Sequence, residues 1–281
     1  TGCEPPRVVA GMPMYNEEET IGTVVTMALR HVDEVICIDD GSSDSSARIA
    51  EACGATVIRH RGNQGYGAAL KTLFKTMRSN DADVLVVLDS DGQHDTSDIP
   101  KLIQPILDEE ADFTIGSRFI EGGEGNDMPA YRRLGIKVIT AASNLTSDLG
   151  IKDTQSGFRA FSRKAIDRLR FDADGMELSL EMLEDAKEKQ LSIQEVPTII
   201  RYDVPKGSNF TAISHGFTVL SWALLSLSQK KPLLTLGIPG LGLLATGAAM
   251  GMNTATGFTT QIDTVLGEGL TAVWIGVLGL A

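Results

Sequence analysis

The chain is poor in cysteine and in positive charge. Its three cysteines, Cys3, Cys37 and Cys53, share no spacing typical of a metal site or a redox pair, so no disulfide framework is expected. There are 25 Lys and Arg against 37 Asp and Glu. The resulting net charge of −12 opposes binding to nucleic acid and is typical of a protein that works in high salt.

Charge is missing altogether between Leu233 and Ile262. The first part, Leu233–Met252, is rich in Gly and Ala and about as long as a helix that spans a bilayer. A second apolar stretch, Thr264–Ala281, carries Glu268. We expect residues 232–281 to be a transmembrane region of about two helices, the second of them cut short. The alternative is a pair of buried helices in a soluble domain.

A basic pair, Lys230 and Lys231, stands directly before this region. The positive-inside rule then places the large N-terminal part in the cytoplasm, anchored at the cell membrane. Just upstream, Phe210–Leu227 carries its apolar residues on one helical face. We expect residues 210–231 to form an amphipathic helix at the membrane interface. Packing of that helix against the domain core is the alternative.

The remaining part, residues 1–209, begins with alternating strand-like and helix-like segments. This alternation predicts an α/β domain in which helices flank a mostly parallel sheet. The strands are expected at Arg7–Gly11, Glu34–Ile38, Ala55–Ile58, Val84–Leu88 and Phe113–Gly116, and the helices at Glu17–Arg30, Ser43–Cys53, Tyr66–Met77 and Pro100–Glu109.

The pattern loosens after this alternating region. Residues 121–128, rich in Gly, Asn and acids, indicate a loop. Helices are expected at 131–149, 164–169 and 176–190. A strand is expected at 192–202, and because it contains Pro197 it should lie at the edge of the sheet.

The most informative motif is D-S-D-G-Q-H, which directly follows the apolar strand Val84–Leu88. A lone D-x-D is usually a solvated turn, but here a buried strand leads into it. Carboxylate and amide oxygens are the ligands that Mg²⁺ or Mn²⁺ prefers. We therefore predict a metal site at Asp89, Asp91 and Gln93, and we interpret His94 as a turn residue or as support for that site.

Two further polar segments follow strands of the same predicted sheet. They are Pro13–Glu17 and Asp39–Ser42. Ligands of open α/β sheets bind at the carboxyl ends of the strands, so these segments and Asp89–Gln93 should build one pocket. Such an acidic pocket would repel a diphosphate unless a divalent cation intervened.

Taken together, these motifs resemble family 2 glycosyltransferases with the GT-A fold, and within them the dolichyl-phosphate mannose and glucose synthases. The resemblance covers about residues 7–204. It rests on an ordered set of motifs: P-x-Y-N-E at Pro13–Glu17, D-D-G-S at Asp39–Ser42, D-x-D-G-Q-H at Asp89–His94, Gly116–Arg118 and Ser156–Arg159.

The resemblance implies roles for individual residues. Positions that carry the metal and the sugar-nucleotide diphosphate match Asp89, Ser90, Asp91 and Gln93, and those that hold the nucleoside match Pro13, Tyr15, Glu17 and Asp39. Arginines that bind the phosphate of the acceptor match Arg118 and Arg132, so that Asp91, Arg118 and Arg132 are the implied catalytic residues. The alternative for either arginine is pairing with the acidic loop. Arg159 lies in a segment near the reacting centre, as a ligand contact or as a structural residue.

The substrates are also implied by resemblance. Ser214–Leu220 and Lys231–Gly240 resemble the membrane junction in relatives of the glucose or hexose type. Where the mannose synthases tend to carry Gly-x-Ser-Lys, this chain has Lys206–Asn209. UDP-glucose or another UDP-hexose is therefore the favoured donor, with dolichyl or polyprenyl phosphate as acceptor. A GDP-mannose-dependent mannose synthase is the alternative.

A phosphate acceptor simplifies the expected chemistry. Its second pKa is about 6, so near neutral pH it is already an anionic nucleophile and needs no general base. A single displacement would then invert the anomeric carbon. A hydroxyl acceptor would need a base, for which Glu181 and Asp153 are the candidates.

Two other functions compete with this interpretation. A processive polysaccharide synthase of the same fold normally needs a downstream Q-x-x-R-W, which the sequence lacks. A catalytically silent membrane scaffold that only binds a sugar nucleotide would not need the complete set of motif acids and arginines.

Overall fold

The computed structural model describes residues 5–121, 140, 150–173, 178–199, 233 and 237–278. They belong to two compact units, Thr1–Ser226 and Leu227–Ala281. The predicted helix at 131–149, apart from Thr140, and the predicted interface helix at 210–231 lie outside the described residues. So does the predicted loop at 121–128, apart from Glu121.

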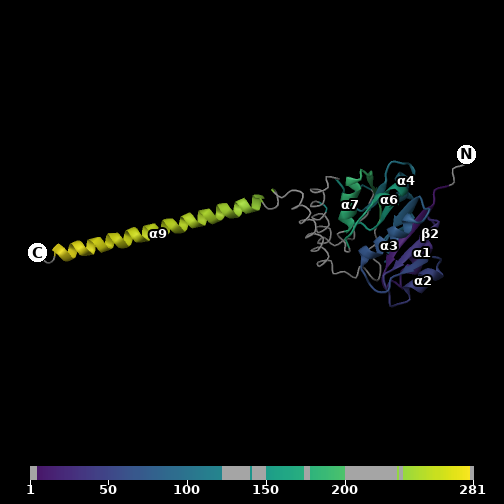
Figure 1. Ribbon diagram of the computed structural model, residues 1–281, viewed down its shortest axis with the longest axis horizontal. Helices are drawn as coiled ribbons and strands as arrows, with labels where there is room; N and C mark the ends of the chain where they lie inside the picture. The colour runs from purple at the N-terminus through teal and green to yellow at the C-terminus, as the bar shows by residue number, and fades with distance from the viewer. Residues whose placement is uncertain are drawn as a thin grey trace. The chain divides into compact units, whose positions relative to one another are not determined.

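The N-terminal unit is built on a seven-stranded sheet with the order β3-β2-β1-β4-β6-β5-β7. Its strands are β1 (Val8–Met14), β2 (Glu34–Asp39), β3 (Thr56–Arg59), β4 (Val84–Val87), β5 (Phe113–Ser117), β6 (Arg159–Ser162) and β7 (Ile193–Pro197). All neighbouring pairs are parallel except the two that β6 makes with β4 and β5. The predicted mostly parallel α/β sheet is confirmed (Figure 1).

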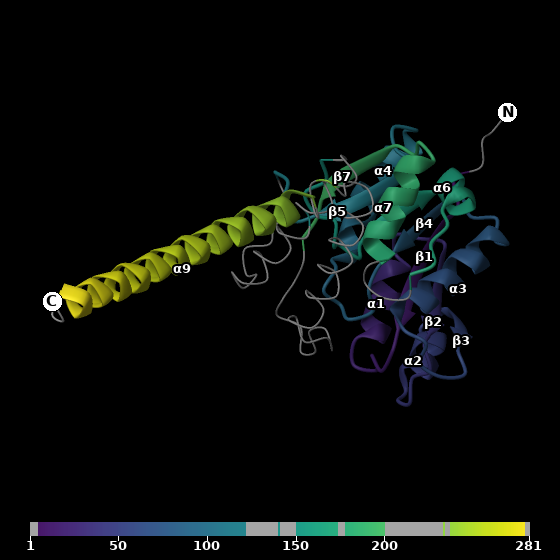
Figure 2. The same cartoon turned by 60° about the vertical axis from the view of Figure 1, so that its left-hand side comes forward.

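Helices cover both faces of this sheet (Figure 2). One apolar cluster joins the sheet to α1, α2 and α4, and the other joins it to α3, α6 and α7. The helices are α1 (Ile21–Ala28), α2 (Ser46–Ala52), α3 (Tyr66–Arg78), α4 (Ile99–Leu107), α6 (Arg163–Arg168) and α7 (Leu178–Glu188), with a 3₁₀ turn, η1 (Thr96–Asp98), before α4.

The central strands are apolar without interruption because both of their faces are buried. In β4, Val84 and Val86 pack into one cluster, whereas Leu85 and Val87 pack into the other. Side chains alternate across a strand, so a strand covered on both sides needs apolar residues at every position. This is the physical reason why an unbroken apolar run marked the strand that leads into Asp89.

Strand β6 is the element that the sequence did not predict. It runs antiparallel between β4 and β5, with Val86 opposite Ala160 and Phe113 opposite Phe161. Its sequence, RAFS, is neither an unbroken apolar run like that of β4 nor part of the regular strand–helix alternation, so only the pairing with two neighbours identifies it as a strand. The insertion brings the segment before β6 close to the end of β4.

The prediction of an edge strand containing Pro197 is confirmed. Within the described residues β7 pairs with β5 alone, and Pro197 is its last residue, opposite Ser117. A proline has no N–H for a ladder bond and is tolerated at such a position. The ladder continues one residue further, where the N–H of Thr198 donates to the carbonyl of Ser117.

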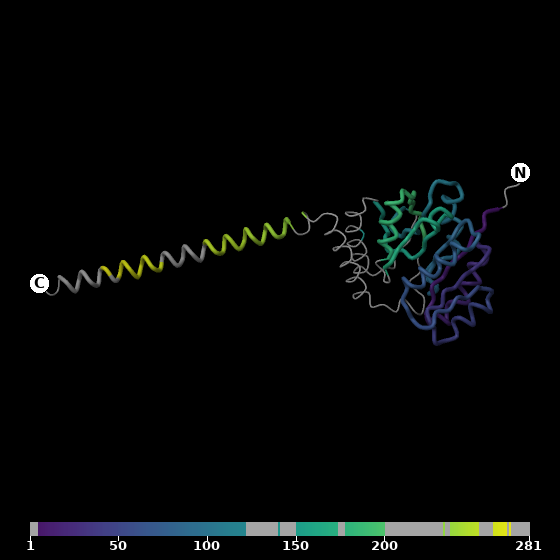
Figure 3. Tube along the Cα trace, in the orientation of Figure 1, coloured from purple at the N-terminus to yellow at the C-terminus, as the bar shows by residue number. Residues whose placement is uncertain are grey.

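The C-terminal unit contains α9 (Ile238–Leu278), one continuous helix of 41 residues (Figure 3). It runs through most of both apolar stretches for which about two helices were expected. Large apolar side chains such as Leu241, Leu244 and Leu266 are exposed on it. Among the described helices, none reaches the combination of length and hydropathy that crossing a membrane requires.

Candidate active site

Three polar loops meet at the carboxyl edge of β1, β2 and β4. The hydroxyl of Ser90 donates to the carbonyl of Pro13 at 2.9 Å, and the hydroxyl of Thr20 donates to the carbonyl of Ser90 at 2.8 Å. The N–H of Asn16 donates to the hydroxyl of Ser42 at 3.0 Å. The structure thus brings together the three segments that the sequence placed at one edge, and it gives Ser90 a role in joining two of them.

The loops after β1 and β2 form the corner where a nucleoside was expected. Met14 and Asp39 are opposite each other in the parallel ladder. Asp39 is buried, and its Oδ1 accepts from the N–H of Ser42 at 2.9 Å. Tyr15 is 41% exposed, which leaves its ring accessible to a ligand. Asn16 adopts a positive φ of 57°, a conformation that asparagine tolerates better than most residues.

In the loop after β4, the carboxylates of Asp91 and Asp89 have different surroundings. Oδ1 of Asp91 accepts from the N–H of Gln93 at 2.9 Å, which closes a tight turn around Gly92. Gly92 has a φ of 76°, a value that favours glycine. The Asp89 side chain is 37% exposed and is held from several sides. This loop therefore holds two acids and an amide in a defined turn.

Asp89 lies between Tyr66 and His94. Its Oδ1 is 3.5 Å from the phenol oxygen of Tyr66, and its Oδ2 is 3.3 Å from Nε2 of His94. Burial alone would raise the pKa of Asp89, but His94, Tyr66 and the charge of Arg159 together hold that pKa below its usual value. The carboxylate is therefore kept ionised, as a metal ligand must be.

The segment before β6 forms the floor under this carboxylate. A Cβ at Gly157 would lie 2.6 Å from Oδ2 of Asp89, so only glycine fits there without displacing the acid. The neighbouring Phe158 is fully buried, and its ring lies 5.1 Å from the ring of His94. The contact of His94 with Asp89 agrees with its interpretation as support for the metal site, whereas the contacts of Tyr66 and Gly157 with Asp89 were not predicted. The signals in the sequence were the position of His94 directly after the D-x-D motif and the motif Ser156–Arg159, which contains Gly157.

Arg159 is buried beneath the site with 3% exposure. Its Nε donates to the carbonyl of Ser156 at 2.8 Å and its Nη2 to the carbonyl of Thr154 at 3.0 Å. Burial lowers the pKa of the guanidinium, and the nearby acids, Asp153 and Asp89 among them, oppose that shift. The structure therefore shows Arg159 as a support for the loop and a balancing charge for Asp89. Its predicted contact with a ligand stays a prediction.

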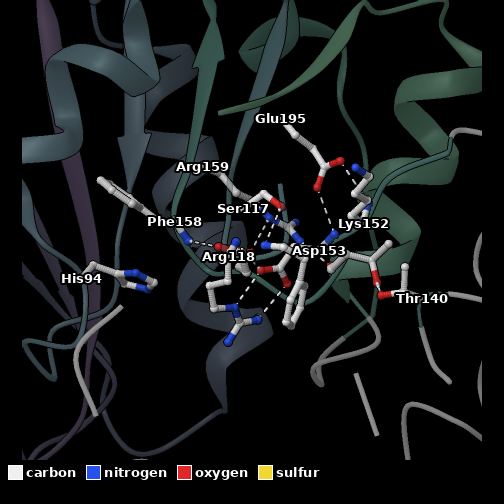
Figure 4. Close-up of polar contacts among 12 residues, drawn as sticks. His94, Ser117, Arg118, Thr140, Lys152, Asp153, Phe158, Arg159 and Glu195 are labelled. Carbon is white, nitrogen blue, oxygen red and sulfur yellow. Dashed lines mark hydrogen bonds and ion pairs between the residues drawn. The ribbon is translucent and has the colours of Figure 1, made fainter. Parts of the chain in front are cut away.

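Arg118 follows β5 and forms a buried ion pair with Asp153 (Figure 4). Its Nε and Nη2 donate to the two carboxylate oxygens, each at 2.7 Å, and its backbone N–H donates to Oδ2 at 3.1 Å. The backbone N–H of Asp153 in turn donates to Glu195 on β7 at 2.9 Å. The guanidinium is thus fixed in orientation. Arg132, its predicted companion, lies outside the described residues.

The carboxylate oxygens at this edge of the sheet suit a hard cation that is coordinated partly by the protein and partly by a bound ligand. Within the described ranges, no three His, Cys, Asp or Glu side chains converge on one point as a site made by protein alone would need. Mg²⁺ and Mn²⁺ are commonly held by one or two carboxylates together with phosphate oxygens of a substrate. Asp89 and Asp91, both ahead of a glycine turn at a strand end, fit that mode of binding.

Comparison with known proteins agrees with this architecture. Residues 10–170 match the family described as Glycosyl transferase family 2. The chain is 33% identical to UDP-N-acetylglucosamine–dolichyl-phosphate N-acetylglucosaminyltransferase of Methanococcus voltae, over 79% of this chain and 96% of that one. It is 32% identical to dolichol-phosphate mannosyltransferase of Pyrococcus furiosus, over 66% and 54%.

A solved structure shares the fold. Glucosyl-3-phosphoglycerate synthase from Mycobacterium tuberculosis, in complex with Mn²⁺ and UDP-glucose, superposes with a TM-score of 0.61 at 25% identity. The match covers 80% of this chain and 79% of that one. An α/β sheet with an acidic carboxyl edge and this match define a glycosyltransferase of the GT-A type. The chain belongs to glycosyl transferase family 2.

The close approach of Gly157 to Asp89 gives a testable prediction. Replacing Gly157 with Ala should push the Asp89 carboxylate out of place and lower kcat/KM about 10- to 100-fold, since small displacements of catalytic groups are costly. Steady-state transfer assays on the purified variant measure this. Gly247→Ala is the matched control because a Cβ there meets no atom within 4 Å. A G157A variant with the wild-type rate would contradict the prediction.

Proposed function

We propose that this protein transfers a hexose from a nucleoside-diphosphate sugar to the phosphate of a dolichyl or polyprenyl phosphate, as a step in glycan assembly or protein glycosylation. UDP-glucose is the favoured donor. The observation that carries the proposal is the engagement of Asp153 and Glu181, the two carboxylates named above as candidate general bases, in structural contacts. An acceptor that brings its own negative charge needs no such base.

The two candidate bases are both used in structural contacts. Asp153 is fully buried and bonded through both oxygens to Arg118. Glu181 on α7 accepts from the backbone N–H groups of Asp172 and Ala173, at 3.0 and 2.8 Å. Both oxygens of each carboxylate are therefore already engaged inside the protein, whereas a general base must lie within hydrogen-bond reach of the proton that it abstracts. A hydroxyl acceptor is therefore less well supported than a phosphate.

The donor half of the reaction falls to the loops after β1, β2 and β4. Tyr15, Glu17 and Asp39 would contact the nucleoside, together with Pro13. Asp89, Asp91 and Gln93 would hold Mg²⁺ or Mn²⁺ against the diphosphate. When bound, that metal would neutralise the charge that develops on the leaving phosphate oxygens. The turn around Gly92 and the contacts to Asp89 keep the acids in place for this task.

The acceptor phosphate would be bound by Arg118 and Arg132. The Arg118 guanidinium is held in one orientation by Asp153, and its planar fork of N–H donors suits phosphate oxygens. Arg132 would join it. Fixing a phosphate oxygen behind the anomeric carbon can supply about 7–11 kcal/mol through proximity and orientation. The outcome is a single inverting displacement, so an α-linked donor gives a β-linked lipid product.

The lipid acceptor also requires that the catalytic unit work at a membrane. A polyprenyl tail lies in the bilayer and leaves its phosphate at the surface. We propose that the apolar segments predicted at residues 232–281, together with the interface helix predicted at residues 210–231, keep the enzyme at the cytoplasmic face of the membrane. The exposed apolar side chains of α9 support this role. Retention of the full chain in the membrane fraction after a carbonate wash would test it.

A donor panel tests the whole proposal. Membranes containing the protein are incubated with dolichyl phosphate, Mn²⁺ and labelled UDP-glucose, UDP-N-acetylglucosamine or GDP-mannose, and the lipid extract is counted. We expect label from UDP-glucose to exceed that from the others at least tenfold. Preferential label from another donor would contradict the proposed preference for UDP-glucose but would support the proposed transfer to a lipid phosphate. An absence of lipid label with every donor and with other polyprenyl phosphates would overturn the reaction itself.

A further inference from the structure

The segment His60–Tyr66 connects the two ends of the donor site, although no motif assigned it a role. It leaves β3 beside Asp39, where the N–H of His60 donates to the Asp39 carbonyl at 2.8 Å. It ends in Tyr66, the first residue of α3, whose phenol oxygen is 3.5 Å from Asp89. One short segment therefore runs from the expected nucleoside corner to the expected metal carboxylate.

Asp40 fastens this segment at the N-terminus of α3. Its Oδ2 accepts from the N–H of Gly65 at 2.7 Å, and its Oδ1 accepts from the N–H of Gln64 at 3.0 Å. Gly65 is the residue at the N-terminal cap of α3 and has no side chain to cap the helix. A carboxylate bound at the positive end of a helix dipole is favourably placed. Asp40, which directly follows β2 and is 4% exposed, thus supplies the missing cap.

A second contact joins Asp40 to the next turn of α3. Oδ1 of Asp40 is 2.7 Å from Nδ1 of His60, and Nε2 of His60 is 2.8 Å from the hydroxyl of Thr72. The backbone is also tightly packed here, because a Cβ at Gly41 would lie 2.6 Å from the backbone of Gly62. The start of α3 is therefore held at two points, and Tyr66 has little freedom to move away from Asp89.

Tyr66 is suited to hold Asp89 as a hydrogen-bond donor. Its phenol O–H donates to Oδ1 of Asp89 at 3.5 Å. Tyr66 also lines a small cavity together with Gly157 and Arg159. The Tyr66 phenol and the Gly157 backbone therefore both lie against the Asp89 carboxylate.

We propose that Asp40 and Tyr66 are positioning residues for the donor site: Asp40 fixes the start of α3, and Tyr66 uses that fixed position to hold Asp89 for the metal–diphosphate complex. The inference rests on the proposed function, because it assigns Asp89 to that complex. It goes beyond the proposed function because it assigns Asp40, the second aspartate of D-D-G-S, a role different from that of Asp39. Asp39 faces the nucleoside, and Asp40 aligns the metal carboxylate.

The first test removes the Tyr66 hydroxyl and measures binding rather than turnover. The dissociation constant of Mn²⁺ is determined calorimetrically on the purified full chain with saturating UDP, and with GDP if UDP does not bind. Loss of a residue that orients a metal ligand typically weakens metal binding about 10- to 100-fold. Because the contact at 3.5 Å is long, we expect Tyr66→Phe to weaken binding about tenfold. Thr76→Val is the control, since it also removes one hydroxyl bond from α3.

The second test asks whether Asp40 acts through Tyr66. Asp40→Asn should weaken Mn²⁺ binding in the presence of UDP, and the double variant D40N/Y66F should bind no more weakly than the weaker single variant. Tm values for all variants separate this effect from a general loss of stability. Y66F binding Mn²⁺ as tightly as the wild type would overturn the inference, even if D40N failed to fold. A wild-type protein that binds no Mn²⁺ with either nucleotide would instead overturn the proposed function on which it rests.

Discussion

Replacing Asp91 with Asn is expected to lower kcat/KM for lipid glycosylation about 10³-fold while leaving the fold intact. The substitution keeps an oxygen that can accept from the N–H of Gln93, so the turn around Gly92 should survive. It removes one negative charge from the proposed metal site, and with it part of the stabilisation of the departing diphosphate. Losing a group that stabilises charge in a transition state typically costs about 10²–10³-fold, and weakened metal binding adds to this.

The control for this prediction lies in the same loop. Asp95 accepts from the N–H of Ser97 and caps η1, and asparagine caps helices about as well as aspartate does. Asp95→Asn removes the same charge four residues away and should stay within about threefold of the wild type. Raising Mn²⁺ should restore part of the D91N activity if its defect is in metal affinity. Near-normal turnover by D91N would exclude this loop as the metal site.

The second large effect is expected at the buried pair of Arg118 and Asp153. Breaking a buried ion pair by removing one charge typically costs about 3–5 kcal/mol, because the other charge is left without compensation. Asp153→Asn should therefore lower the free energy of unfolding by about that amount. It should also raise the KM for dolichyl phosphate more than the KM for the sugar nucleotide, because the freed guanidinium no longer points in one direction.

A double replacement separates stability from function. In Arg118→Met with Asp153→Leu, an apolar pair of similar volume replaces two charges, a change that is often neutral or stabilising. The double variant should regain most of the thermal stability that D153N loses and should still fail to transfer sugar to the lipid. Full activity in the stable double variant would show that the pair is structural and that the acceptor phosphate binds elsewhere.

The sheet and the meeting of its loops could be predicted because their signals are local. An unbroken apolar run such as Val84–Leu88 is required wherever helices cover both faces of a strand, and the polar residues after it must then lie at the carboxyl edge. Pro197 marked an edge strand by the donor that proline lacks. Each of these inferences needs only the residues of one segment and the geometry of a strand.

The contacts that complete the candidate site could not be predicted in the same way. Strand β6 is four residues long and is fixed by pairing with β4 and β5. The partner of Arg118 is 35 residues away in sequence, whereas the acidic loop beside Arg118 offered nearer candidates. No periodicity links positions so far apart, because the distance between them is set by how the intervening chain packs.

The sequence by itself determined which chemical groups stand at the strand ends: two carboxylates and an amide after β4, and acids and an aromatic ring after β1 and β2. Only the tertiary structure decided which of these groups face a ligand and which face each other. It turned Asp40 toward the start of α3, Asp153 toward Arg118, and the backbone of Gly157 toward Asp89. The physical reason is that buried charges must find partners, and a partner is available only where the folded chain brings one within hydrogen-bonding distance.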